Sequence, residues 1–385
     1  MKRIYFDNAA TSPVHKEVSA LMLEYMTDKY GNPSSVHALG REAHRVVSIA
    51  REKVANLIAA SPQEIYFTSG GTESDNLALI GIAQANKMKG NHIITSTIEH
   101  HAILHTCEFL ETQGFEVTYL PVDEFGMIDM NDLLSAIKKT TILISIMYAN
   151  NEVGTLQPIR EIGAIARENN IYFHTDAVGA IGSHNISVLD DNIDLLTIAG
   201  HKLNAPKGIG ALYIRNGVKI QSIQHGGDHE RNIRAGTENV PGIIGLGRAC
   251  EIAKDNMSDK IKHLTSLRDK IINEVLTRIP QVKLNGHPTI RVPGNVNFSF
   301  SHIEGESLLL NLDLKGIAAS SGSACSSGAL NPSHVLLAMG MSPEEAHGSL
   351  RITLGKFNTE NEVDYFLYVL PEIVSRLRSI STLSN

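Results

Sequence analysis

The stretch from residue 141 to 178 decides the fold, because it contains strand, helix and strand patterns in direct succession. It begins with the apolar run TILISIMYANN (141–151), continues with the helical pattern IREIGAIARENN (159–170) and ends with IYFHTDAV (171–178). Apolar strands separated by a helix of this length are typical of a parallel βαβ unit, whose sheet is covered on both faces. The sequence therefore predicts an α/β fold.

The same alternation extends to both sides of this stretch. Five further strand-like runs are EIYFTS (64–69), HIITSTIEHH (92–101), FEVTYLPV (115–122), IDLLTIAGHK (193–202) and GALYIRNG (210–217). Helical patterns follow the first two of them, at 73–87 and 102–114. We expect these runs to form one mostly parallel seven-stranded sheet in a large domain spanning 14–255.

The pattern changes after about residue 250. A long amphipathic helix is predicted over 251–279, followed by the strand NVNFSF (295–300) and a helical C-terminus. We expect a smaller α+β domain formed by 1–13 and 256–385, since 385 residues are too many for one simple core.

Composition excludes several classes of protein. A net charge of −7 gives no general attraction to nucleic acid or to an anionic membrane surface, and no apolar run reaches the length of a membrane span. Three widely spaced cysteines (Cys107, Cys250 and Cys325) predict neither a disulfide framework nor a metal site. We therefore expect a cytoplasmic protein with no membrane partner and no direct contact with nucleic acid.

Polar clusters follow the strands, where parallel α/β sheets bind their ligands. Three of them match the anchors of pyridoxal phosphate: glycines around Gly71 and Thr72 for the phosphate, Asp176 for the ring nitrogen and Lys202 for a Schiff base. Each has a simpler interpretation by itself. Thr72 or Asp176 could cap a helix, and Lys202 could be a solvated charge like Lys207 in the same loop.

Two further positions fit such a site. His100, or its neighbour His101, could stack on a cofactor ring and move protons, although a histidine at a strand end is more often structural. Arg351, on a strand-like run, could clamp the carboxylate of an amino acid or form a surface ion pair.

Together these motifs resemble the pyridoxal-phosphate-dependent cysteine desulfurases of the NifS/IscS type, which are fold-type I (class V) aminotransferases. The resemblance covers nearly the whole chain. Its motifs are YFDNAAT, GNPSSVH, FTSGGTESDN, EHHA, NNEVGTLQPI, HTDAV, GHK…PKGIG, GGDHERNIRAGTENV, SSGSAC and LRITLG. The form SSGSAC is similar to that of family members with a long cysteine loop.

The resemblance implies a role for each matching residue. Lys202 would hold the cofactor, Asp176 would keep its ring nitrogen protonated and His100 would stack on the ring. The residues implied around the phosphate are Gly71, Thr72, His201 and Thr237, the last from the partner subunit of a homodimer. Asn151 would lie near the ring hydroxyl and the substrate carboxylate, and Arg351 would bind that carboxylate.

The implied activity is the conversion of L-cysteine to L-alanine, with the sulfur passed as a persulfide on Cys325 to an acceptor. Small neighbours of Cys325 suit a thiol that moves between substrate and acceptor. The acceptor would be an iron–sulfur scaffold protein or an enzyme of tRNA thiolation. His100 could take the proton of the substrate thiol.

Two positions depart from the family pattern. Gly179 stands where the family has a glutamine that binds the phenolic oxygen of the cofactor, and Ala199 where it has a serine that binds the phosphate. These departures are the only support for one alternative, a non-enzymatic partner subunit. Two enzyme alternatives also stay open: a selenocysteine lyase, and another pyridoxal-phosphate lyase or transaminase in which Cys325 is a bystander.

Overall fold

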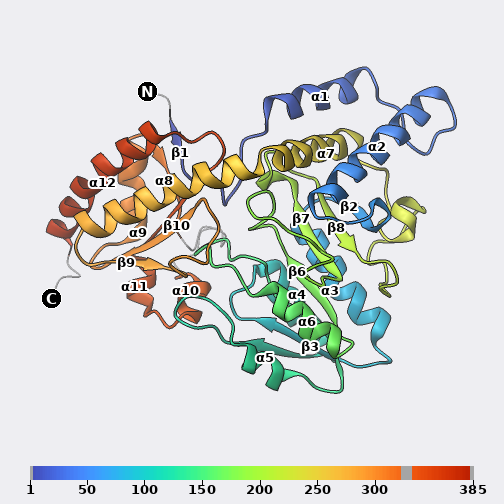
Figure 1. The fold of residues 1–385 in the computed structure, drawn as a ribbon, viewed down its shortest axis with the longest axis horizontal. Helices are drawn as coiled ribbons and strands as arrows, with labels where there is room; N and C mark the ends of the chain where they lie inside the picture. The colour runs from blue at the N-terminus through green and yellow to red at the C-terminus, as the bar shows by residue number, and fades with distance from the viewer. Residues whose placement is uncertain (1–2, 322–331, 382–385) are drawn as a thin grey trace.

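The computed structural model describes residues 3–321 and 332–381, and its largest element is a seven-stranded sheet (Figure 1). From one edge to the other, the strands are β2 (Ile65–Thr68), β8 (Gly210–Ile214), β7 (Leu195–Ala199), β6 (Tyr172–Asp176), β5 (Thr141–Ser145), β3 (His92–Ser96) and β4 (Glu116–Leu120). Neighbouring strands are parallel, except that β8 is antiparallel to both β2 and β7. The predicted α/β fold with a mostly parallel seven-stranded sheet is confirmed.

Successive residues of a strand point to opposite faces of the sheet, and here both sets are apolar. Helices therefore cover both faces of this sheet. Ile94 and Leu196 belong to one apolar cluster, whereas their neighbours Ile93 and Leu195 belong to another. The first cluster takes in α1 (Lys16–Thr27), α2 (Ala38–Leu57), α5 (Met130–Ala136), α6 (Ile159–Glu168) and α7 (Val240–Asp255). The second takes in α3 (Gly71–Asn86) and α4 (His101–Thr112).

A separate apolar cluster lies beside the large sheet (Figure 1). It is built on the antiparallel strands β12 (Ser349–Thr353), β10 (Asn295–Phe300) and β9 (Val282–Asn285), and on α8 (Met257–Arg278), α9 (Gly305–Leu314) and α12 (Glu360–Ile380). Phe6 is buried in this cluster, and β1 (Ile4–Tyr5) pairs with β11 (Ile317–Ala318). The two clusters agree with the proposed division into 14–255 and 1–13 with 256–385, whose boundaries stay a prediction.

The long helix expected over 251–279 is two helices. The first, α7, begins at Val240 and ends at Asp255, and α8 begins at Met257. Asn256 separates them with φ −108° and ψ 10°, and its side-chain amide donates to the carbonyl of Ile252 at 2.8 Å. An asparagine side chain that competes for a backbone carbonyl in this way is a common cause of a helix break.

Short elements complete the chain. They are the 3₁₀ helices η1 (Pro62–Glu64), η2 (Gly200–Lys202) and η3 (His229–Asn232), and the helices α10 (His334–Ala338) and α11 (Pro343–His347). Within the two described ranges, no helix has both the length and the apolar character needed to cross a bilayer.

Candidate active site

Three of the predicted site residues, Asp176, Lys202 and His100, lie at the carboxyl edge of the large sheet. Asp176 is the last residue of β6, and Lys202 ends η2, which directly follows β7. Because β6 and β7 are adjacent and parallel, their ends bring the acid and the lysine together. His100 follows β3 after a short loop, since that strand ends at Ser96 and not at His101 as the sequence suggested.

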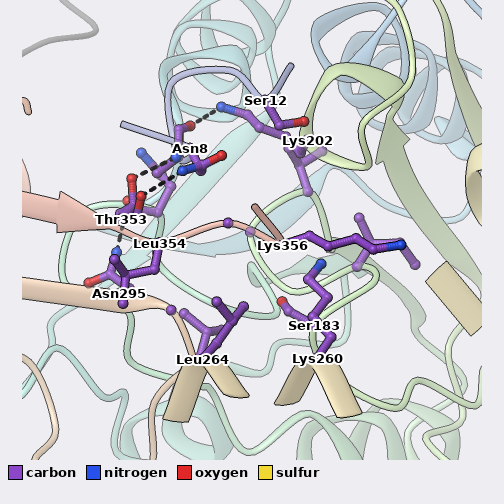
Figure 2. A pocket seen from close by; sticks show the side chains of 18 of the residues that line it. Asn8, Ser12, Ser183, Lys202, Lys260, Leu264, Asn295, Thr353, Leu354 and Lys356 are labelled. Carbon is purple, nitrogen blue, oxygen red and sulfur yellow. Dashed lines mark hydrogen bonds between the residues drawn. The ribbon is translucent and has the colours of Figure 1, made fainter. Parts of the chain in front are cut away.

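Lys202 lines a cavity between the large sheet, the N-terminal segment, α8 and the chain that follows β12. Its Nζ donates to the carbonyl of Ala10 at 2.9 Å and also to that of Ala9. Figure 2 shows Lys202 reaching toward the segment that carries Asn8 and Ser12. The cavity, of about 740 Å³ including its open mouth, is also lined by Asn151, Val178, Gly179, Asn295 and Thr353. Lys207, the alternative candidate, is exposed outside it.

Asp176 lies at the floor of the site as a buried carboxylate. Burial raises its pKa to about 6, and the Val178 amide, donating to Oδ1 at 2.9 Å, opposes that rise. The residues after Asp176 form turns and no helix, so the alternative role as a helix cap is not observed. A buried carboxylate of this kind suits a cationic ring nitrogen as its partner.

Two further buried acids, which the sequence analysis missed, surround Asp176. Asp75 on α3 has its pKa raised by burial and by the charge of Asp176, and its Oδ1 lies 3.7 Å from Nε2 of His174. Burial raises the pKa of Glu99 to about 8, although Ser96 donates to this carboxyl at 2.6 Å. At neutral pH Glu99 is protonated and uncharged, so it does not repel a negative charge on Asp176.

We predict that Glu99 makes the free energy of unfolding fall as pH rises. Its pKa is about 8 in the folded chain and near the ordinary 4.5 after unfolding, so unfolding releases a proton between these values. The stability contribution is complete below pH 4.5 and is lost as pH rises toward 8, by at most about 1.4 kcal/mol per pH unit. Urea unfolding from pH 5 to 8 should give a shallower slope for Glu99→Gln, and an unchanged slope would contradict this assignment.

The start of α3 is suited to an anion. Its N-cap is Gly70, which provides no capping side chain, so Thr72 is not the helix cap that the simpler interpretation required. A Cβ on Gly71 would lie 3.3 Å from Val178 and 3.6 Å from Ala199, which is close packing. Uncapped amides at a helix N-terminus, reached over glycines, are well placed to bind phosphate.

His201 and Thr237 have different surroundings. Burial, together with the charge of Lys202, lowers the pKa of His201 to about 4, so its ring is neutral. Thr237 is exposed in the loop between η3 and α7. That loop is tied to the start of α3 by Arg234, whose Nε donates to Glu73 at 2.8 Å.

Arg351 and Asn151 lie next to each other. Arg351 is fully buried on β12, which excludes the surface ion pair considered from sequence. Its Nη2 donates to Asp7 at 3.1 Å and its Nη1 donates to the carbonyl of Asn151 at 3.4 Å. Among residues 3–321 and 332–381, its Nε has no hydrogen-bond partner. An unsatisfied, buried guanidinium nitrogen has the chemistry that a carboxylate would complete.

Cys325 lies outside the described residues, but the chain on either side of 322–331 is fixed at this site. Ser320 pairs with Arg351 through two backbone hydrogen bonds, of 3.2 and 2.7 Å. Ser333 donates to the buried carboxyl of Glu152, whose pKa burial raises to about 7. Both ends of the segment that carries Cys325 are therefore anchored next to the candidate carboxylate clamp.

The backbone explains one departure from the family pattern. A Cβ on Gly179 would lie 2.5 Å from the carbonyl oxygen of Ala149, a separation that non-bonded atoms do not adopt. The chain here runs too close to Ala149 for any side chain without a shift of the backbone. Nothing in the structure explains Ala199.

These residues fit pyridoxal phosphate. The uncapped start of α3 matches its phosphate, the buried carboxylate of Asp176 matches its ring nitrogen, and Lys202 from the adjacent strand end matches its aldehyde. Within the part of the chain that the structure describes, Nε of Arg351 has no hydrogen-bond partner, and a substrate carboxylate would supply one.

Comparisons with known proteins agree with this chemistry. The class-V aminotransferase family model matches residues 4–366. The chain is 59% identical over 383 residues to a Methanosarcina thermophila protein named cysteine desulfurase IscS, covering 100% of this chain and 95% of that protein. A Clostridium botulinum protein of the same name is 55% identical over 384 residues, covering 99% and 97%.

Solved structures are similar over comparable lengths. A NifS-like protein superposes with a TM-score of 0.92 at 41% identity, covering 97% of this chain and 100% of that one. The structure of SspA in complex with cysteine superposes with a TM-score of 0.82 at 37% identity, covering 92% and 100%.

Proposed function

The chain belongs to the class-V aminotransferase family and is a pyridoxal-phosphate-dependent cysteine desulfurase, and we propose a role in the reaction for each residue of the site. One observation carries the proposal. The adjacent ends of β6 and β7 bring the buried carboxylate of Asp176 near Lys202, and Lys202 lines a cavity together with Asn151.

The cofactor would be held at three places. Lys202 would bind it covalently, Asp176 would pair with its ring nitrogen, and the amides of Gly71 and Thr72 would bind its phosphate. His201 and Thr237, the latter from a second copy of the chain, would complete the phosphate site. When bound, pyridoxal phosphate supplies an electron sink for the carbon that bears the substrate amine.

The protein's own groups would then orient L-cysteine and move its protons. Arg351 would bind the substrate carboxylate, with Asn151 beside it. Lys202, once its amine is free, would take the proton from Cα and return one later in the reaction. Asp176 would stay ionised and keep the opposite charge fixed on the ring nitrogen.

Cys325 would accept the sulfur. Its thiolate would attack the sulfur of the substrate, so that one S–S bond forms and the C–S bond of cysteine breaks. The electron pair of the C–S bond would pass to the substrate carbon, which takes up a proton, and L-alanine would leave. What supports this role is the fixed position of both flanks, Ser320 beside Arg351 and Ser333 beside Glu152. The persulfide on Cys325 would pass its sulfur to an iron–sulfur scaffold protein or a tRNA-thiolating enzyme.

Three finer statements belong to the same proposal. The chain would act as a homodimer, since the exposed Thr237 would complete the site of a second copy. It would work in the cytoplasm, where thiols stay reduced. Its sulfur acceptor would be a protein rather than nucleic acid, in keeping with the net charge of −7.

A direct assay tests the proposal. Purified protein supplied with L-cysteine and a reductant should release alanine and sulfide in equal amounts and without a keto acid. A requirement for a keto acid would indicate a transaminase, and activity with selenocysteine alone would indicate a selenocysteine lyase. A protein that binds the cofactor but converts neither amino acid would support the hypothesis of a non-enzymatic partner subunit.

A further inference from the structure

The strand β10 has one apolar face and one polar face. The residues that belong to the apolar cluster beside the large sheet are Val296, Phe298 and Phe300. Successive residues of a strand point to opposite sides, so the alternate residues share the other face. They are Asn295, Asn297 and Ser299, and all three are buried. A buried face of amides and hydroxyls needs hydrogen-bond partners inside the protein.

The polar face continues across the three-stranded sheet. Asn297 is paired in register with Arg351 on β12 and with Asn285 on β9, so the three residues form one row across the strands. Directly opposed residues of an antiparallel pair have their side chains on the same face. Nδ2 of Asn285 donates to Oδ1 of Asn297 at 2.8 Å. The proposed carboxylate clamp, Arg351, therefore lies in the same row as two amides.

This face contacts the loop between β5 and α6, which carries Asn151. Nδ2 of Asn297 donates to the carbonyl of Glu152 at 3.0 Å. Nδ2 of Asn295 lies 3.3 Å from the carbonyls of both Asn151 and Glu152. Arg351 also donates to the carbonyl of Asn151. Two successive carbonyls of the loop are thus bound by side chains of one sheet face.

The next two carbonyls of the loop are held by the chain that leads into β10. Nη2 of Arg291 donates to the carbonyl of Val153 at 2.9 Å, and the backbone N–H of Val292 donates to the carbonyl of Gly154 at 2.9 Å. All four carbonyls of residues 151–154 therefore accept hydrogen bonds from the other side of the cavity. The backbone of the loop is fixed at each of these positions.

The loop matters because of where Asn151 lies. Asn151 lines the cavity together with Lys202. Asn295 lines the same cavity, and Figure 2 shows it next to Thr353, its partner in register on β12. The row that contains Arg351 thus also fixes the backbone that carries Asn151.

We propose that Asn297, with Asn295 beside it, is a positioning residue that sets Asn151 against Arg351 and thereby the affinity for an amino-acid carboxylate. It acts through the backbone of the loop. Lys202 and Asp176 are held by other strand ends and keep their places when the amide is lost. This role rests on the proposed function, because it names a residue that orients the substrate of that reaction.

Asn297→Ala tests this role, with Ser299→Ala as the matched control. The hydroxyl of Ser299 accepts from Nδ2 of Asn285 at 2.8 Å, and within the described residues it makes no hydrogen bond to the loop. Each variant removes one acceptor of Asn285, but only Asn297→Ala removes the donor at Glu152. We expect Asn297→Ala to raise KM for L-cysteine about tenfold, the effect of one lost hydrogen bond, and to keep kcat within about threefold. Ser299→Ala should keep both constants.

A binding measurement without turnover provides a second readout. L-Alanine is added to the holoenzyme, and its Kd is taken from the change in absorbance of the bound cofactor. The Kd should rise about tenfold in Asn297→Ala and stay unchanged in Ser299→Ala, with equal retention of the cofactor in both. A merely structural role would lower the unfolding midpoint of both variants without separating their Kd values. Asn295→Ala, which removes the donor at two carbonyls, carries the same expectation if Asn297→Ala does not fold.

The outcomes separate this inference from the function on which it rests. An active Asn297→Ala protein with wild-type KM and Kd would overturn the positioning role, as would a loss of kcat with KM unchanged. A wild-type protein that forms no alanine from L-cysteine, but whose affinity for L-alanine depends on Asn297 as expected, would contradict the proposed function alone.

Discussion

Replacing Lys202 by alanine is expected to lower the rate of alanine formation from L-cysteine by about 10⁴-fold or more, because two functions are lost together. The variant has no amine to bind the cofactor covalently and no base to move the Cα proton. Steady-state measurement of alanine gives the rate, and the absorbance of the cofactor after gel filtration reports whether it is still retained.

Lys207→Ala is the matched control for this variant. Lys207 lies five residues further along the same loop but is exposed and does not line the cavity. We expect it to keep the wild-type rate. A Lys202→Ala protein with more than a few per cent of the wild-type rate would contradict the assignment, as would a comparable loss in Lys207→Ala.

The second large effect is expected for Cys325→Ser, which should abolish the release of sulfide and reduce alanine formation to background. A serine hydroxyl is a far weaker nucleophile than a thiolate and forms no persulfide. Cofactor binding should stay intact, because none of the proposed cofactor ligands changes. The same preparation of Cys325→Ser should therefore lack activity in the assay but still show the absorbance of the bound cofactor.

The other two cysteines provide the control for Cys325. Cys107 and Cys250 are fully buried, and burial raises the pKa of both thiols, that of Cys250 to about 12. Neither can supply a thiolate near neutral pH. Cys107→Ser should therefore keep the ability to release sulfide, and full activity in Cys325→Ser would leave the transaminase or lyase reading in its place.

The regular part of the fold could be predicted from the sequence because its signals are local. Each strand of the large sheet is an apolar run bounded by polar residues, and the ends of such strands in a parallel sheet lie at one edge. This geometry was sufficient to place Lys202 and Asp176 together. It also indicated the loop before α3 as a candidate anion site, with a plain helix cap by Thr72 as the equal alternative from sequence.

Other features depend on packing between distant segments. The first turns of α7 carry glycines that lower helix propensity, yet Gly247 lies so close to α2 that a Cβ there would be 2.7 Å from Ala50. Asp75 on α3 and Glu99 in the loop between β3 and α4 come near Asp176 only when the sheet and its helices are assembled, so their raised pKa values have no signal in sequence spacing. An acidic residue in an otherwise apolar helix face, such as Asp75, was the one available clue.

His100 shows where the two kinds of information combine. The sequence identified it as a histidine at a ligand-binding edge that could move a proton, and the resemblance implied that it stacks on the cofactor ring. Only the helix that begins at His101 reveals that Nδ1 is already used as the cap of α4. The residue could be named from sequence, but its protonation state required the backbone.

Mass spectrometry of the enzyme after brief exposure to ³⁴S-labelled L-cysteine tests the central claim most directly. The protein is alkylated and digested, and each of the three cysteine peptides is examined for bound ³⁴S. We predict labelled persulfide on Cys325 alone, formed in step with alanine in a single turnover. Alanine formed without label on Cys325, or label on Cys107 or Cys250, would contradict it.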